Sequence, residues 1–275
     1  VPFRFDGATS QGAELLLCTR VPPRAIAVSV PDSSPLFERD LRGTTACYAT
    51  VGAHGQWLIF TNASPDGSPS RMRYSRYDRS GAALGPEWID LPSLAGGPRS
   101  VRAASATREG FAWVSTGPYG RDDLEVGSLA RTGGDARSAP IGDTVEAEAI
   151  APWPHRTPGL VAVVVSAVGG VRVDLFDATL ARIGVSSVVD PNHCRYGLVT
   201  GDFGLALAVE SSGPGDHTTR VYRVGETLEL TQVAAFERMR TGCGYLGVES
   251  DGQHLVLYAR EEAHAVAWLL SCFER

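Results

Sequence analysis

Six short apolar segments recur along this chain, and their spacing limits the folds open to it more than any other feature. The segments read LLLCTR, WLIFTN, FAWVST, LVAVVVS, LALAVES and LVLYAR, and each begins 42 to 54 residues after the previous one. A glycine precedes each of them within three residues and can adopt the positive φ that a tight hairpin turn requires. Runs of this length and composition, bounded by turn residues, predict buried β-strands.

Three further strand-like segments surround each apolar one. A segment rich in small residues precedes it, as in VRAASA at 101–106. An alternating segment follows it, as in VDLFDATLARIG (Val173–Gly184), which turns at Asp-Ala-Thr and ends at a glycine. Similar stretches, MRYSRYDRSGAALG and LEVGSLARTGGDA, occur elsewhere in the chain. We interpret all three as the outer hairpin of a repeated four-stranded unit, since alternation indicates strands with one solvated face.

Six four-stranded units with a period of about 45 residues are typical of a β-propeller. We therefore predict an all-β fold, a six-bladed β-propeller of four-stranded antiparallel blades, with 1–275 as one domain. The predicted blades are 1–42, 43–96, 97–140, 141–190, 191–240 and 241–275. Only SCFER follows AVAWLL, so we expect that the last unit lacks an outer strand or that residues missing from either terminus complete it. A pair of β-sandwiches would also give many short strands and remains the alternative.

The chain resembles the broad class of bacterial six-bladed propellers with WD-like or TolB-like repeats. The resemblance covers the whole chain but concerns the architecture only. The Trp-Asp dipeptide, the Asp-box of sialidases and the kelch double glycine are missing from the sequence. The class contains hydrolases, lyases, lectins and protein scaffolds, so it implies a fold and no particular activity.

Composition excludes several kinds of partner and chemistry. A net charge of −6 gives no electrostatic reason to expect nucleic-acid binding, and no apolar run is long enough for membrane insertion. All 25 basic residues are arginine, which excludes Schiff-base and P-loop lysine chemistry. The chain does not open on a charged and then apolar leader, so we expect a signal peptide to be absent or already removed. We expect a monomeric bacterial protein that is secreted or periplasmic.

The loops between blades and the loops after the second strands share one face of a propeller, where ligands usually bind. Three arginines from different units lie close to the start of inner strands, and together they could bind a carboxylate, sulfate or phosphate group. In the alternative interpretation, each arginine pairs with an acid of a neighbouring blade. The predicted ligand-binding residues are Arg102, Arg195, Arg240, Glu148, Tyr48 and His193.

An enzyme is the second interpretation. His193, His217 and His264 map to the same face, close to Asp216, Glu261 and Glu262. Imidazole and carboxylate groups can bind a metal or transfer protons, as in propeller lyases, glycoside hydrolases or lactonases. The histidines lack metal-motif spacing, the chain has no G-x-S-x-G elbow, and no serine has a plausible histidine and aspartate order. We therefore predict no metal site and no cofactor, and structural roles for His54, His155 and His254.

The first interpretation is an extracytoplasmic binding or scaffold protein. Its partner would be a protein, or a small anionic or carbohydrate ligand, bound at the mouth of the central channel. A sugar-binding lectin is a further alternative, although the five tryptophans occupy different strand positions and do not repeat from unit to unit.

Four of the five cysteines fall in positions that allow two disulfides. Cys47, Cys194 and Cys243 begin inner strands, and Cys18 ends the second strand of the first unit. We predict the pairs Cys18–Cys47 and Cys194–Cys243, with Cys272 left over. The alternative is that all five are buried thiols.

Overall fold

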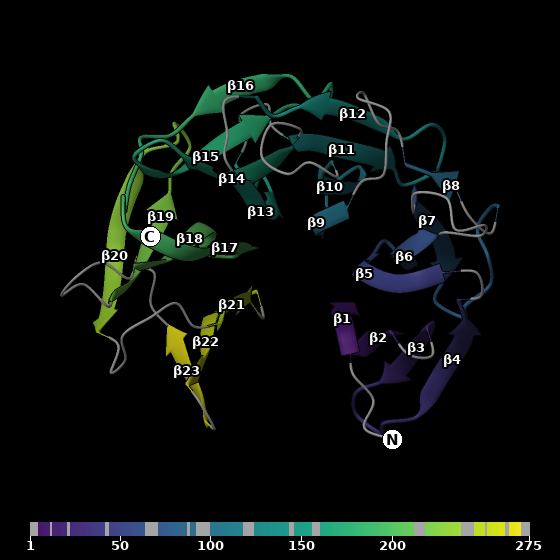
Figure 1. The fold of residues 1–275 in the computed structure, drawn as a ribbon. Helices are drawn as coiled ribbons and strands as arrows, with labels where there is room; N and C mark the ends of the chain where they lie inside the picture. Colours follow the sequence, from purple (N-terminus) through teal and green to yellow (C-terminus); the bar gives the residue numbers. More distant parts are fainter. Residues whose placement is uncertain are drawn as a thin grey trace. The chain divides into compact units, whose positions relative to one another are not determined.

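The computed structural model describes residues 5–11, 13–20, 23–41, 44–63, 71–86, 89–91, 100–117, 124–142, 146–155, 160–211, 218–237, 245–250, 252–261 and 264–270. Within these ranges every regular element is a β-strand, and no helix is long and apolar enough to cross a bilayer. The chain divides into two compact units, Val1–Pro140 and Ile141–Arg275, and each unit contains three antiparallel sheets (Figure 1).

In the first unit each sheet is a meander of four consecutive strands, so that every strand pairs with the next one along the chain. The strands are β1 (Phe5–Gln11), β2 (Glu14–Arg20), β3 (Pro23–Ser29) and β4 (Pro35–Asp40), then β5 (Thr44–Ala53), β6 (Gln56–Ala63), β7 (Arg71–Asp78) and β8 (Ile89–Asp90), then β9 (Ser100–Ala106), β10 (Gly110–Thr116), β11 (Leu124–Ala130) and β12 (Arg137–Pro140).

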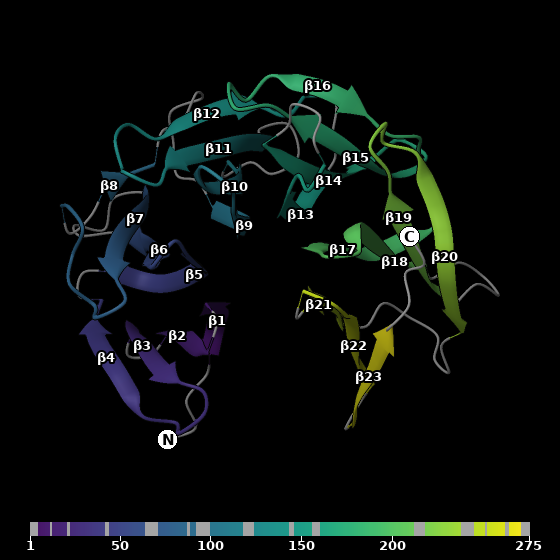
Figure 2. The ribbon, with the colours of Figure 1, turned by 180° about the vertical axis from the view of Figure 1, so that it is seen from behind.

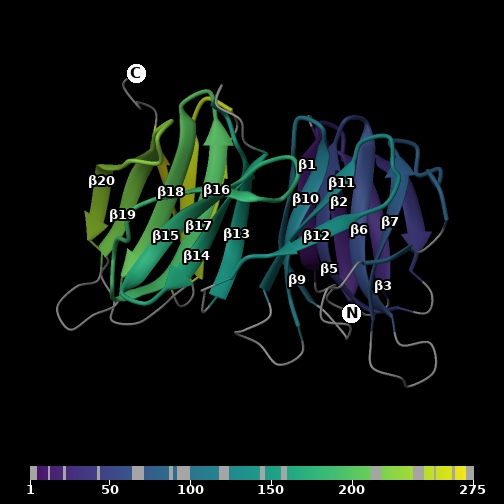
Figure 3. The same cartoon turned by 90° about the horizontal axis from the view of Figure 1, so that it is seen from above.

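The second unit repeats this arrangement, and the strands of its first two sheets lie side by side in both Figure 2 and Figure 3. Its last sheet has three strands among the described residues; Ser271–Arg275 lie outside them. The strands are β13 (Glu146–Pro152), β14 (Val161–Ala167), β15 (Gly170–Phe176) and β16 (Arg182–Val185), then β17 (His193–Gly201), β18 (Gly204–Ser211), β19 (Thr218–Val224) and β20 (Leu230–Glu237), then β21 (Tyr245–Ser250), β22 (Leu255–Glu261) and β23 (His264–Leu270).

The apolar segments form the second strands, and in the middle sheet of each unit the sheets on both sides cover this strand. Trp57 and Ile59 of β6 pack against the sheet β1–β4, whereas Leu58 and Phe60 pack against the sheet β9–β12. In the second unit, alternate residues of β18 pack against the sheets β13–β16 and β21–β23 in the same way. The prediction that the apolar segments form buried β-strands is confirmed for β6, β10, β14 and β18.

Two of the turn histidines hold neighbouring sheets together. His54 lies in the turn between β5 and β6, and its Nε2 is 2.7 Å from the carbonyl oxygen of Thr107 in the next sheet. His155 follows β13, and its Nε2 is 3.1 Å from the carbonyl oxygen of Val224. A carbonyl only accepts hydrogen bonds, so Nε2 carries the proton in both rings. These contacts agree with the structural roles predicted for the two residues.

The glycines before the apolar strands serve two different purposes. Gly55 has a φ of 71° in the turn between β5 and β6, and Gly204 and Gly252 also have positive φ values. Gly110 does not, so the expectation of a left-handed turn residue is wrong there. A Cβ on Gly110 would lie 2.1 Å from the carbonyl oxygen of Leu129, so glycine is required by the close approach of β11. Gly12 and Gly159 lie outside the described residues.

The outer hairpins of three sheets share one turn chemistry. Asp177 accepts hydrogen bonds from the backbone N–H and the hydroxyl of Thr179, at 2.8 and 2.7 Å. Asp78 accepts the equivalent bonds from Ser80, and Asp32 accepts them from Ser34. Such side-chain bonds to the following residues stabilise tight turns. The stretch VDLFDATLARIG therefore has two close structural relatives, in the hairpins β3–β4 and β7–β8.

We expect stability to fall as the pH is lowered from about 4 towards 2. Hydrogen bonds from Ser29 and Ser34 hold the pKa of Asp32 at about 2, below its ordinary value of 3.8. Hydrogen bonds to the charged carboxylate likewise lower the pKa values of Asp78 and Asp177. A pKa that is lower in the folded state gives stabilisation above the unfolded pKa, and this is lost as pH falls through the folded pKa.

Thermal-unfolding midpoints between about pH 2 and pH 6 test this expectation. The variant Asp32→Asn removes one titrating carboxylate, so its midpoint should depend less steeply on pH than that of the wild type. Equal pH dependence in the two proteins would contradict the assignment of this turn.

Candidate functional site

The first strands of five sheets carry a β-bulge near their beginning. In each of these strands, one residue has no partner in the hydrogen-bonded pairing with the second strand. The residues before and after this skipped residue pair with two consecutive residues of the second strand. Each bulge lies opposite the end of the second strand, close to the loop that leads to the third. The skipped residues are Asp6, Tyr48, Arg102, Glu148 and Cys194, and β5 skips Thr45 as well.

These bulges coincide with the residues predicted to bind a ligand. Tyr48, Arg102 and Glu148 are skipped residues, and His193 and Arg195 flank the skipped Cys194. A bulge takes one residue out of the hydrogen-bonding ladder and redirects its side chain, which is why bulges are common beside functional sites. The bulge itself is a feature that the sequence analysis did not predict. The remaining predicted residue, Arg240, lies outside the described residues.

The first strands of neighbouring sheets lie next to one another within each unit. In the first unit β5 lies between β1 and β9, and in the second unit β17 lies between β13 and β21 (Figure 1). The strand positions of Tyr48 and Arg102 are thus brought together in one unit, and those of Glu148 and Arg195 in the other. Arg102 and Arg195 are exposed and His193 is half-buried. For Tyr48 and Glu148 the structure describes the strand position only.

Arg195 has an acid directly across its own ladder. It pairs in register with Glu210 of β18, which is 1% exposed. Side chains of directly opposed residues lie on one face of a sheet with Cβ atoms about 4.5–5.5 Å apart. The alternative interpretation placed such an acid in a neighbouring blade, whereas the register places Glu210 in the same sheet as Arg195.

His193 contacts a serine that the sequence analysis did not associate with it. Its Nε2 is 2.9 Å from Oγ of Ser166, the second-last residue of β14, and its Nδ1 is 3.2 Å from the carbonyl oxygen of Asp190. The expectation that no serine has a plausible histidine and aspartate order stays a prediction, although Ser166 and His193 are in contact. The two residues are 27 positions apart on facing sheets, and Asp190 contributes its carbonyl in place of its carboxylate.

The carboxylate of Asp190 is fixed separately. It accepts hydrogen bonds from Arg220 Nη1 at 2.7 Å and from the hydroxyl of Tyr222 at 2.6 Å. The hydroxyl of Ser211 lies 3.3 Å from the same carboxylate. Asp190 is 9% exposed and has a φ of 51°, a left-handed conformation that is uncommon outside glycine. The surrounding bonds therefore hold this strained residue, and with it the carbonyl that faces His193, in one position.

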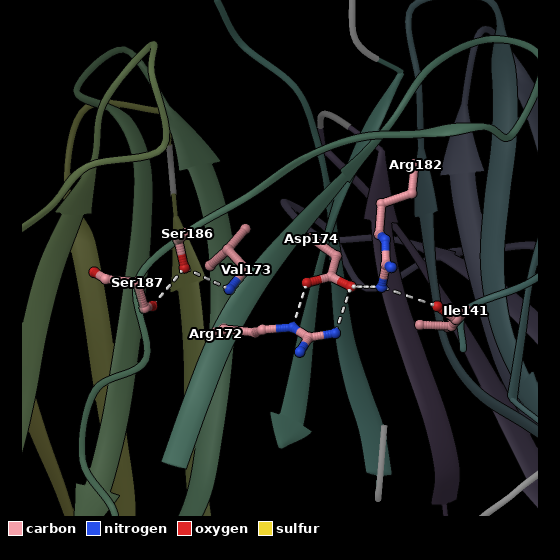
Figure 4. Close-up of polar contacts among 7 residues, drawn as sticks. All are labelled: Ile141, Arg172, Val173, Asp174, Arg182, Ser186 and Ser187. Atoms are coloured by element: carbon pink, nitrogen blue, oxygen red, sulfur yellow. Dashed lines mark hydrogen bonds and ion pairs between the residues drawn. The ribbon is translucent and has the colours of Figure 1, made fainter. Parts of the chain in front are cut away.

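A second buried carboxylate lies on β15 (Figure 4). Asp174 is fully buried, and its oxygens are 2.7 Å from Arg172 Nε and 3.2 Å from Arg182 Nη1. Arg182 also donates to the carbonyl oxygen of Ile141 at 3.4 Å. Next to this pair of arginines, Ser186 Oγ accepts the N–H of Val173 at 2.9 Å. These contacts fasten the edge strand β16 to β15, so we assign this cluster to stability.

The structure tests the predictions for the remaining histidines and for the cysteines only in part. His217 lies outside the described residues, and for His264 only the strand position at the start of β23 is described. The described residues contain no group of three or more His, Cys, Asp or Glu side chains arranged to hold a metal ion. Cys18 is disulfide-bonded, while its pairing with Cys47 stays a prediction. Cys194 is a half-buried thiol, which contradicts the predicted pair between Cys194 and Cys243.

No protein-family model and no curated protein matches the chain, whereas many solved structures do. The chain is similar to the β-propeller domain of Cps50 (Swd1) from Myceliophteria thermophila, with 13% identity, a TM-score of 0.61, and 98% of this chain and 87% of that one covered. It is also similar to the Dos1 propeller, with 8% identity, a TM-score of 0.60, and 97% and 67% covered. The chain has the β-propeller fold. The chain is also similar to KlAtg21 in its complex with the coiled coil of AgAtg16, with 11% identity, a TM-score of 0.68, and 98% of this chain and 81% of that one covered.

Proposed function

We propose that this chain is a single six-bladed propeller that binds a partner protein through the surface around its bulged first strands. The six described sheets would be its blades, because each lies within one of the ranges 1–42, 43–96, 97–140, 141–190, 191–240 and 241–275. Similarity to solved propellers over 97 to 98% of the chain supports one continuous array of blades. Ring closure would bring the first strands of all six blades to a common centre.

The repeated bulge is the observation that carries the proposed binding site. The skipped residues Asp6, Tyr48, Arg102, Glu148 and Cys194 place acidic, aromatic, basic and thiol side-chain types at equivalent points in the first strands of five sheets. Arginine and tyrosine are enriched at the energetic centres of protein interfaces, where they combine apolar area with hydrogen bonding. Arg102 and Arg195, both exposed, are the best-described contacts of this kind.

Two observations favour a protein partner that is met outside the cytoplasm. The similar structure of KlAtg21 is a complex with a coiled coil, so a protein of comparable architecture binds a protein segment. The disulfide of Cys18 is typical of oxidising compartments, which supports a secreted or periplasmic location. Asp6 and Glu148 are acidic and the arginines are basic. Charges of both signs are more complementary to a polar protein surface than to a small anion.

Site-specific photo-cross-linking in the cells that make the protein tests this proposal. A photoreactive phenylalanine analogue replaces Arg102 or Arg195 in the full chain, and cross-linked products are identified by mass spectrometry. Both positions should capture the same partner protein. The double variant Arg102→Ala/Arg195→Ala should then weaken binding of that partner by at least about 30-fold, since a single interface hot spot contributes at least about 2 kcal/mol and about 1.4 kcal/mol is a factor of ten.

Arg108 and Arg137 provide matched controls. Both are exposed arginines of the sheet β9–β12, in the β9–β10 turn and on the edge strand β12, away from the bulge. The same analogue at these positions should not capture the partner. Capture of one protein equally from all four positions would overturn the proposed surface. If no protein is captured and the purified chain retains an anionic metabolite or a glycan, the ligand is a small molecule and the proposal of a protein partner is wrong.

A further inference from the structure

Ser166 and His193 have the geometry of a nucleophile and its general base. Ser166 lies near the end of β14 and His193 begins β17, and their Oγ and Nε2 atoms are 2.9 Å apart. The other ring nitrogen of His193, Nδ1, faces the carbonyl oxygen of Asp190 at 3.2 Å. A hydroxyl, an imidazole and a third group that orients the imidazole are the three parts of an activated serine.

The hydrogen-bond partners determine which ring nitrogen carries the proton. The carbonyl of Asp190 can only accept, so in the neutral ring Nδ1–H donates to it. Nε2 is then the unprotonated nitrogen and accepts the hydroxyl proton of Ser166. The opposite tautomer would place the lone pair of Nδ1 against the lone pairs of the carbonyl. The ring is therefore held as a base that points at the serine hydroxyl.

The position of the orienting carbonyl is itself fixed. Arg220 and Tyr222 bind the carboxylate of Asp190 at 2.7 and 2.6 Å, and the residue keeps its left-handed φ of 51°. Asp190 therefore acts as a positioning residue through its backbone. Buried hydroxyls at the ends of other second strands have different partners: Thr19 Oγ1 lies 3.5 Å from the carbonyl oxygen of Arg24, and Ser211 bonds within the Asp190 network.

We propose that Ser166 is a nucleophile, activated by His193, that accepts the acyl group of small esters. Oγ attacks the ester carbonyl carbon while its proton passes to Nε2, and the C–O bond to the leaving alcohol breaks as Nε2 returns the proton to that alcohol. Water then attacks the acyl-serine with the same base, releasing the carboxylic acid and regenerating Ser166. Ser166 is 8% exposed, which restricts the acyl group to a small one, and the neighbouring Val168 is 94% exposed in the adjoining turn.

Covalent labelling of the wild-type chain with a fluorophosphonate probe tests this proposal directly. The probe forms a stable bond to an activated serine, and peptide mapping should place it on Ser166. Hydrolysis of p-nitrophenyl acetate should accompany labelling. The variant Ser166→Ala should abolish both, and His193→Gln should slow both by about 10²- to 10⁴-fold, the usual contribution of a general base.

Ser115→Ala is the matched control. Ser115 is 1% exposed at the same place in β10, one residue before the strand ends, and should be replaceable without loss of labelling. Melting curves of each variant separate loss of folding from loss of the nucleophile. A wild-type label that is absent or lies on another residue overturns the proposal whatever the variants do. So does unchanged labelling in a folded His193→Gln chain. None of these outcomes depends on a partner bound at Arg102 and Arg195.

Discussion

Replacing Asp174 by alanine should lower the free energy of unfolding by about 3–5 kcal/mol, the usual effect of removing one partner from a buried ion pair. Asp174 is fully buried between Arg172 and Arg182, whose side chains are 15% and 33% exposed. The variant would leave two positive charges close together and largely out of water, without the carboxylate that compensates them. Urea unfolding followed by far-ultraviolet circular dichroism measures the loss.

Asp90→Ala is the matched control for this prediction. Asp90 also binds an arginine of a third strand, with 2.6 Å between Oδ1 and Arg73 Nε, but it is 48% exposed. Water already solvates about half of the Asp90 side chain and screens the pair, so the loss should be about 0–1 kcal/mol. If Asp174→Ala and Asp90→Ala lower the free energy of unfolding equally, burial of the carboxylate does not determine the size of the loss.

A triple replacement identifies the source of the loss. Arg172→Met, Asp174→Leu and Arg182→Met together remove every charge of the cluster while keeping similar volume. Apolar replacement of a buried ion cluster is often neutral or stabilising. The triple variant should therefore recover most of the stability that Asp174→Ala loses. A triple variant as unstable as the single one would contradict the explanation by uncompensated charge.

The strand pattern could be predicted from sequence because burial dictates composition. Each apolar segment forms the second strand of its sheet, and where sheets cover both faces, as for β6 and β18, almost no position tolerates a polar residue. The outer hairpins could be recognised from Asp-x-Ser/Thr turns, because their hydrogen bonds join residues two positions apart. The apolar strand composition and the turn motif each involve residues close together in the chain, so both can be recognised from the sequence.

The bulges could not be predicted, because they change pairing and leave composition unchanged. EAEAIA at 146–151 reads as a regular alternation, yet the ladder skips Glu148 and breaks the period of two. Three of the skipped residues, Tyr48, Arg102 and Glu148, were still selected as candidates, since their place before the apolar segments is local information. Which of them lie close together depends on how the sheets are arranged, and the sequence pattern does not contain this.

The contact between Ser166 and His193 joins two sheets, and no local sequence pattern predicts it. A hydroxyl residue occurs near the end of several apolar segments, as at Thr19, Thr61 and Ser115, so Ser166 follows a common pattern. Nothing local distinguishes it from the others. The distinction comes from His193, which begins the first strand of the next sheet and reaches Ser166 only after the two sheets pack.

Replacing Trp113 by alanine should lower the free energy of unfolding by about 3–5 kcal/mol, the usual range for a buried aromatic side chain. Trp113 of β10 is 1% exposed and packs beside Phe60, with ring centroids 5.6 Å apart. Its partner directly across the ladder is Gly127 of β11, and a Cβ there would lie 2.2 Å from Cε2 of the indole. The ring therefore occupies the space that a side chain at 127 would need.

This geometry makes the effect of Gly127→Ala depend on Trp113. In the wild type the added methyl group collides with the indole, and overpacking of this kind costs about 1–3 kcal/mol. In the Trp113→Ala background the methyl enters the space that the indole has left, and alanine also restricts the unfolded chain more than glycine does, so the same substitution should be neutral or stabilising. Urea unfolding of the wild type, both single variants and the double variant measures the coupling. Equal losses from Gly127→Ala in the two backgrounds would mean that backbone conformation, and not the indole, selects glycine at this position.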